Sequence, residues 1–236
     1  AVPGAAEAIS SLRARGVAIR YVTNRANRTT GEVQRQLQGM GLECGPDEVI
    51  TSAEATADFL EPEPVYVIGE RGLLEALDRR GFVIDAVSAK TVIVSYDRGF
   101  SYDKLATAAR LIGNGARFVA TNADRGLRIA SGLVPGTGSL VAAVETATGV
   151  KPLIVGKPER LIFDITLRSM GLSAENVVAV GDNLDTDIPA GAAAGIRTAF
   201  ILTGVSTRAD LARTSVAPTW VVEDYTELRR VLDASA

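Results

Sequence analysis

The sequence has no histidine among its 236 residues. This absence excludes a Ser-His-Asp triad, a Cys-His pair and a histidine-ligated zinc site within the chain. A single cysteine, Cys44, leaves no partner for an intrachain disulfide, which fits a reducing cytoplasm. Any catalysis by these residues therefore depends on carboxylate, lysine and hydroxyl groups.

Signals for several other classes of protein are also missing. The net charge is −3 and no long run of Lys or Arg occurs, so the chain lacks an electrostatic footprint for nucleic acid or an anionic membrane. No apolar run approaches the roughly 20 residues needed to cross a bilayer. Gly156-Lys157 is followed by Pro158, where a Walker A motif needs Ser or Thr. We expect a cytoplasmic protein that binds neither nucleic acid nor membrane.

The distribution of apolar residues indicates the fold. Apolar, β-rich runs alternate with segments patterned as helices, which predicts an α/β fold with a Rossmann-like, doubly wound parallel sheet. The predicted strands are 17 to 24, 65 to 69, 91 to 97, 117 to 122, 152 to 156, 177 to 182 and 196 to 202. The predicted helices are 4 to 15, 30 to 40, 70 to 80, 101 to 114, 138 to 148, 158 to 170, 187 to 194 and 207 to 213. Several should end at a glycine, namely Gly16, Gly41, Gly81, Gly115, Gly149, Gly171 and Gly195.

Two proline-containing stretches suggest domain boundaries. Glu61-Pro-Glu-Pro64 and Leu133-Val-Pro-Gly136 are stiff junctions between patterned segments. They predict a core made of residues 1–61 and 136–236, with residues 62–135 inserted as a second α/β domain.

An acidic turn follows one of the predicted strands. In GDNLDTD, residues 181 to 187, three aspartates lie within six residues, and such like charges repel unless a cation or a basic group compensates them. Oxygen ligands without nitrogen or sulfur nearby suit Mg²⁺. Asp182 would be the metal ligand, and Asp187 would hold a metal-bound water or orient Lys157. The alternative is that these residues only form a turn and cap a helix.

Polar residues follow two further strands. Thr23-Asn24 ends one and Gly156-Lys157 follows another. Ligand sites in open α/β sheets lie beyond the carboxyl ends of the strands. Each pair alone is weak evidence, but a hydroxyl, a lysine and an acidic loop in this order predict a phosphate site.

These stretches also carry a family resemblance. VTN (22 to 24), VGKP (155 to 158) and GDNLDTD (181 to 187) resemble the second, third and fourth motifs of haloacid-dehalogenase-like (HAD) phosphatases, and more narrowly of their class IIA subgroup. The resemblance implies Mg²⁺-dependent hydrolysis of a small phosphate monoester, such as a sugar, glycerol or glycolate phosphate. It also implies an aspartyl-phosphate intermediate, a C2-type cap formed by the inserted domain, and a possible homodimer.

The resemblance assigns roles to individual residues. Thr23 would bind the phosphate and Asn24 would order its loop. Lys157 would neutralise the charge of phosphate and nucleophile. Asp182 would bind Mg²⁺, supported by Asn183 and Asp187. Many relatives have a second asparagine at the position of Arg25, which would bind an anionic part of the substrate or simply face solvent.

The family's first motif, Asp-x-Asp-Gly after an apolar strand, does not occur in the sequence. Its aspartates would be the nucleophile and the general acid and base, so neither role has a candidate here. We therefore expect a truncated sequence, short by roughly 10 to 20 residues of strand and loop, and an inactive chain. The alternatives are a non-catalytic protein that binds a phosphorylated metabolite and a phosphotransferase.

Overall fold

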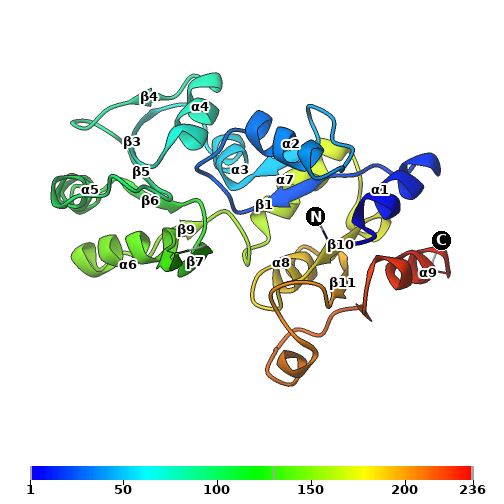
Figure 1. Cartoon of the computed structure of the whole chain (residues 1–236). Helices are drawn as coiled ribbons and strands as arrows, with labels where there is room; N and C mark the ends of the chain where they lie inside the picture. Colours follow the sequence, from blue (N-terminus) through cyan, green and yellow to red (C-terminus); the bar gives the residue numbers. More distant parts are fainter. Residues whose placement is uncertain (1, 130, 235–236) are drawn as a thin grey trace. The chain divides into compact units, whose positions relative to one another are not determined.

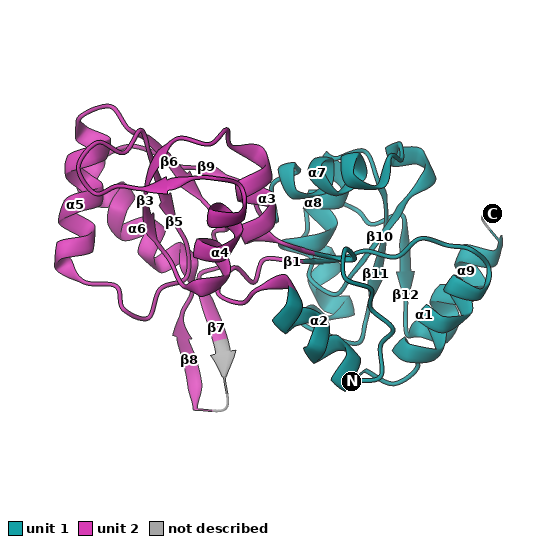
Figure 2. Cartoon of the chain, turned by 90° about the horizontal axis from the view of Figure 1, so that it is seen from above, with its two compact units in different colours: residues 1–22, 31–49, 157–236 teal, residues 23–30, 50–156 magenta. Residues whose placement is uncertain are grey.

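The structure, a computed structural model, describes residues 2–129 and 131–234. Figure 1 gives the element labels, and Figure 2 colours two compact units. Unit 1 comprises Ala1–Val22, Gly31–Val49 and Lys157–Ala236, and unit 2 comprises Thr23–Thr30 and Ile50–Gly156. Each unit has its own sheet and its own buried core.

Unit 2 is built on a parallel five-stranded sheet in the order β4-β3-β5-β6-β9. Its strands are β3 (Pro64–Ile68), β4 (Val83–Ile84), β5 (Thr91–Val94), β6 (Arg117–Ala120) and β9 (Leu153–Ile154). Its helices are α3 (Ser52–Phe59), α4 (Arg71–Arg79), α5 (Tyr102–Gly113) and α6 (Thr137–Thr148). An antiparallel hairpin of β7 (Gly126–Ile129) and β8 (Gly132–Pro135) extends away from this sheet (Figure 2). The inner strand β5 is buried along its whole length, as expected in a parallel sheet covered on both faces.

Unit 1 holds a parallel three-stranded sheet in the order β10-β11-β12. These strands are β10 (Val178–Gly181), β11 (Arg197–Ile201) and β12 (Trp220–Val222). The helices are α1 (Ala5–Ala14), α2 (Thr30–Gly39, its first residue in unit 2), α7 (Leu161–Met170), α8 (Asp187–Ala193) and α9 (Tyr225–Ala234), with 3-10 turns η1 (Ala174–Asn176) and η2 (Arg208–Ala212). The strands β1 (Tyr21–Thr23) and β2 (Val49–Thr51) pair with each other, and α1 lies beside α9 (Figure 2).

The predicted α/β class with parallel sheets is confirmed. All seven glycines expected at helix ends have positive φ, for example Gly149 at 71° and Gly171 at 63°. The predicted helix 207 to 213 is the 3-10 turn η2. Among the described residues, no helix is long and apolar enough to span a bilayer.

The compact units do not coincide with the predicted domain boundaries. Strand β9 pairs with β6, which places it in the sheet of unit 2 rather than in the predicted core. Helix α3 packs against α4, and α6 packs against α5, so both helices also belong to unit 2. The two proline stretches instead begin β3 and end β8 inside this unit. The two proline-containing stretches therefore coincide with the ends of strands and not with the limits of a unit.

An ion pair in unit 1 ties helix α1 to the segment before β2. Arg13 donates from Nη1 to Glu48 Oε1 (2.7 Å), and the two side chains are only 24% and 16% exposed. The hydrogen bonds from Arg13 lower the pKa of the Glu48 carboxyl, despite the opposing effect of burial. The carbonyl of Glu48 also accepts the N–H of Tyr21 at 2.7 Å. This network fixes the start of β1, the strand that leads to Thr23.

The substitution Arg13→Met should lower the free energy of unfolding by roughly 1 to 2 kcal/mol at pH 7, because Glu48 loses a charged partner in a partly buried place. Since the folded-state pKa of Glu48 is depressed, its stabilisation is complete above the unfolded pKa of about 4.3 and disappears as the pH falls through the lower folded value. Urea unfolding of both proteins should therefore converge at acidic pH.

The control for this prediction is Arg208→Met. Arg208 pairs with Glu223 at the surface, with side chains 60% and 64% exposed. Its loss should cost at most about 1 kcal/mol. An equal effect of the two substitutions at pH 7 would contradict the role given to Arg13.

Candidate functional site

Lys157 and Asp187 form a close ion pair in unit 1. The ammonium of Lys157 donates to Asp187 Oδ1 at 2.6 Å and to the carbonyl of Val22 at 3.2 Å. The side chains of Lys157 and Asp187 are 12% and 15% exposed, so solvent screens their attraction only partly. The pair joins Lys157, after β9, to the start of α8 and to β1, the strand that ends at Thr23.

Local geometry brings Asp187 to this position. The amide oxygen of Asn183 accepts the N–H of Asp185 (2.8 Å), which forms a tight turn after β10. Asp187 Oδ2 accepts the N–H of Asn183 (3.2 Å), and Asp187 begins α8, where a carboxylate is favoured by the helix dipole. A Cβ on Gly181 would lie 2.2 Å from the Cβ of Asp187, so only glycine fits there. Asp187 thus lies where it orients Lys157, and the Asn183 side chain takes part in the turn.

Asp182 lies on the same turn but has different partners. Its Oδ2 accepts the N–H of Val205 (2.9 Å), and its carbonyl accepts the N–H of Ser206 (2.9 Å). Within residues 2–129 and 131–234, no hydrogen bond or ion pair to its Oδ1 is found. Burial, together with the charge of Asp182, raises the pKa of the Tyr225 phenol. Of the two carboxylate oxygens of Asp182, Oδ2 therefore accepts a main-chain hydrogen bond and Oδ1 accepts none from the described residues.

The donor set is compatible with Mg²⁺, which is commonly bound by one or two carboxylates with water and substrate phosphate completing its shell. Across the described part of the chain, no group of three or more His, Cys, Asp or Glu side chains lies close enough to hold a metal ion. A protein-only metal cage is thus not found there.

The second predicted part of the site, residues 23 to 25, belongs to unit 2. Thr23 Oγ1 accepts the N–H of Arg25 at 3.2 Å. The amide of Asn24 donates to both carboxylate oxygens of Asp124, at 3.2 and 3.3 Å. Desolvation by burial, followed by the like charge of Arg28, lowers the pKa of the Arg25 guanidinium.

Hydrogen bonds also hold the backbone of Asn24, in addition to its side chain. Its carbonyl accepts the Ser52 hydroxyl (2.7 Å) and the Asn122 amide (3.0 Å), and both of these side chains belong to buried residues. A Cβ on Gly156 would lie 2.6 Å from the Asn24 side-chain oxygen. Asn24 therefore lies where the loops after β1, β6 and β9 meet within unit 2.

The structure thus brings the predicted residues together in two groups. Lys157, Asp182, Asn183 and Asp187 lie in unit 1, and Thr23, Asn24 and Arg25 lie in unit 2. Sequence reasoning missed the loop at 204 to 206 that contacts Asp182, although Gly204 and Ser206 directly after a predicted strand were a signal for a loop.

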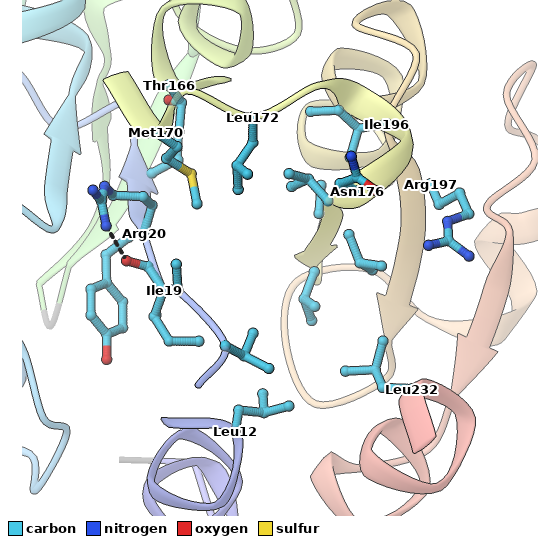
Figure 3. Close-up of a pocket in the computed structure, with 18 of the residues that line it drawn as sticks. Leu12, Ile19, Arg20, Thr166, Met170, Leu172, Asn176, Ile196, Arg197 and Leu232 are labelled. Carbon is cyan, nitrogen blue, oxygen red and sulfur yellow. Dashed lines mark hydrogen bonds between the residues drawn. The ribbon is translucent and has the colours of Figure 1, made fainter. Parts of the chain in front are cut away.

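An apolar slot of about 670 Å³ lies in unit 1 between the segment 17 to 22 and β10 (Figure 3). Apolar side chains from several elements point into it, among them Leu12, Ile19 and Leu172. In the described part of the chain, β10 has a strand partner only on its β11 side. Val180 is 42% exposed although it lies within this apolar strand. The slot therefore combines an unpaired strand edge with apolar walls, and Lys157 and Asp187 also line it.

Known proteins resemble this chain over almost its full length. A haloacid dehalogenase-like hydrolase family matches residues 1–83, and a HAD-hydrolase-like family matches residues 154–228. An acid sugar phosphatase of Staphylococcus saprophyticus is 38% identical, over 98% of this chain and 92% of that protein. The 5'-nucleotidase YutF of Bacillus subtilis is 36% identical, over 94% of this chain and 89% of that protein. The structure of a p-nitrophenyl phosphatase from Archaeoglobus fulgidus matches with a TM-score of 0.92 and 32% identity, covering 98% of this chain and 92% of that one.

The chain therefore belongs to the haloacid-dehalogenase-like hydrolases. Within this family it is a phosphoric monoester hydrolase of the class IIA subgroup, as the sequence motifs predict.

The ion pair of Lys157 and Asp187 can be tested by a double-mutant cycle with Lys157→Met and Asp187→Asn. Because each side chain is largely buried beside the other, we expect a coupling free energy of about 1 to 3 kcal/mol in urea unfolding. Additive effects of the two substitutions would mean that the pair is not formed. Exposed Lys151→Met serves as a control that should not couple to Asp187→Asn.

Proposed function

We propose that the protein hydrolyses small phosphate monoesters in a reaction that depends on Mg²⁺. The observation that carries this proposal is the pairing of Lys157 with Asp187 on the turn that also holds Asp182. A lysine that carries a second hydrogen bond, to the carbonyl of Val22, is fixed as a point charge for a phosphoryl group. Its attraction would grow as negative charge accumulates on the oxygens of the transferred group.

The magnesium ion would be held by Asp182, with Asp187 and Asn183 shaping the turn around it. When bound, it would neutralise charge on the phosphoryl oxygens. Asp187 holds the Lys157 ammonium, and Thr23 would donate its hydroxyl to a phosphate oxygen while Asn24 orders that loop. Lys157 and Asp182 would thereby act on the same phosphate from different chain segments.

None of the residues named above would be the nucleophile of this reaction. We propose that an extended apolar segment ending in Asp-x-Asp-Gly occupies the slot beside β10. The open edge of β10 supports a strand, and the apolar lining supports apolar side chains. At the end of the slot where Asp187 lies, the ammonium of Lys157 also lines it, and this positive charge supports an acidic end of the segment.

In the proposed reaction, the first aspartate of that segment attacks phosphorus and the bond to the leaving oxygen breaks. The second aspartate gives its proton to the departing alkoxide and then takes one from water, which hydrolyses the aspartyl-phosphate. The alkoxide thereby leaves as the alcohol, and hydrolysis releases inorganic phosphate and regenerates the first aspartate. Residues 1–236 alone would then bind phosphate without turnover.

The substrate proposal follows the named relatives. One is an acid sugar phosphatase and another a 5'-nucleotidase. We propose a small sugar, glycerol or glycolate phosphate, with Arg25 meeting an anionic or hydroxyl-bearing part of it. A panel of phosphorylated metabolites with Arg25→Ala as the comparison would test this choice.

The nucleophile proposal predicts a gain of activity. Residues 1–236 should not hydrolyse p-nitrophenyl phosphate above background. A variant extended before Ala1 by about five or six apolar residues, Asp-x-Asp-Gly and a short linker should do so when Mg²⁺ is added. The same extension with Asn-x-Asn should fill the slot without activity. Turnover by residues 1–236 alone would contradict the proposal, and phosphate binding without turnover in every variant would favour a binding protein.

The role of Lys157 predicts a loss of activity in the extended variant. Lys157→Met should lower kcat/KM for p-nitrophenyl phosphate by about 100-fold or more, because the fixed charge is lost where the phosphoryl group gains charge. Lys151→Met removes an exposed lysine a few residues earlier in the chain and should leave kcat/KM unchanged. Equal activity of the two variants would remove Lys157 from the site.

A further inference from the structure

The loop after β11 contacts the turn after β10 at three hydrogen bonds. Val205 N–H donates to Asp182 Oδ2 (2.9 Å) and Ser206 N–H donates to the Asp182 carbonyl (2.9 Å). In the opposite direction, Leu184 N–H donates to the Ser206 hydroxyl oxygen (3.0 Å). These three hydrogen bonds hold the two loops together at Asp182 and Leu184.

Gly204 lies directly against that carboxylate. A Cβ at this position would be 1.6 Å from Asp182 Oδ2 and 2.5 Å from Asp182 Cβ, so no larger residue fits without movement. The φ angle of Gly204 is outside the left-handed region, so the backbone conformation does not itself require glycine. The need for glycine at this position comes from the side chain of Asp182.

Both ends of this loop are anchored. Upstream, β11 is the central strand of its sheet and is buried from Thr198 to Ile201. Downstream, Thr207 and Asp210 form a capping box, in which the N–H and hydroxyl of Thr207 both donate to Asp210 Oδ2 at 2.8 Å. A loop fixed at both ends can hold a neighbouring carboxylate in one orientation.

We propose that the loop from Gly204 to Ser206, termed the clamp loop, positions Asp182 for a divalent cation. The N–H of Val205 in the clamp loop fixes Oδ2, which would leave Oδ1 for the cation. Donors behind a metal-binding carboxylate hold the orientation that the ion needs, so the clamp loop sets the affinity of the site without touching the ion. The identity of the cation rests on the proposed function, whereas the clamp itself rests on the geometry of unit 1.

The first test measures cation binding by residues 1–236. Mg²⁺ is titrated calorimetrically in the presence of inorganic phosphate, and Mn²⁺ binding is followed by electron paramagnetic resonance. Gly204→Ala should raise the dissociation constant of either ion by about 10- to 100-fold. Gly39→Ala adds the same methyl group where no atom lies within 4 Å, and should leave the constant unchanged.

Substitutions at Ser206 provide a milder test, which includes a variant that should restore binding. Ser206→Ala removes the acceptor for Leu184 N–H but keeps its own N–H on Asp182, so the dissociation constant should rise by less than in Gly204→Ala. Ser206→Thr keeps the hydroxyl and should restore binding. A residue that served only to stabilise the fold would lower the melting temperature without this pattern in cation affinity.

A stability cycle tests the clamp without any cation. Gly204→Ala should lower the melting temperature in the wild-type background but much less in Asp182→Gly, where the side chain that it meets is gone. If Gly204→Ala has the same effect in both backgrounds, or leaves cation affinity unchanged, the clamp is refuted. If the cycle shows coupling but the wild-type chain binds neither ion, the proposed metal site is refuted and the clamp stands as a purely structural contact.

Discussion

The ion pair of Lys157 and Asp187 is the interaction on which the functional half of unit 1 depends. It joins a loop after β9 to the first turn of α8, and the second hydrogen bond of Lys157 reaches the carbonyl of Val22 at 3.2 Å. Three segments distant in sequence are thereby brought to one place. A lysine that is largely buried destabilises the folded state unless a carboxylate lies beside it. The local fold and the functional site therefore both depend on the pairing of Lys157 with Asp187.

A chain without histidine cannot use imidazole as a general base, and its polar groups are arranged accordingly. Each carboxylate on the turn after β10 has a different environment. Asp187 is neutralised by Lys157, and Asp182 is oriented by main-chain donors that carry no charge. Asp182 and Asp187 therefore differ in their partners although they lie close together in the sequence. The positive charge beside Asp187 also reduces the repulsion between the two carboxylates.

The sequence predicted the parallel α/β class, because continuous apolar runs between helical patterns leave few other folds, and glycine marked the helix ends. It also predicted that Asp182, Asp187 and Lys157 belong together, since all follow strands. It missed α3 and α9, although Thr51 and Asp224 cap them through Glu54 N–H and through Thr226 and Glu227 N–H. The compact units differ from the predicted domains, because membership of a sheet depends on pairing such as β6 with β9, which no local pattern encodes. The contact of Val205 with Asp182 is equally non-local, and spacing along the chain could not give it.

Two apolar strands, β5 and β10, differ in how far they are exposed to solvent, and this difference bears on what could occupy the slot. Strand β5 lies between β3 and β6 and is fully buried, whereas Val180 of β10 is 42% exposed. Exposed apolar area costs about 25 cal/mol per Å², and an open strand edge also leaves main-chain donors and acceptors without a strand partner. Filling the slot with a strand would remove both costs at once. The same strand would end beside Lys157, so the contact that completes the sheet would also deliver its last residues to the phosphate site. Stability and catalysis would then depend on a single pairing event.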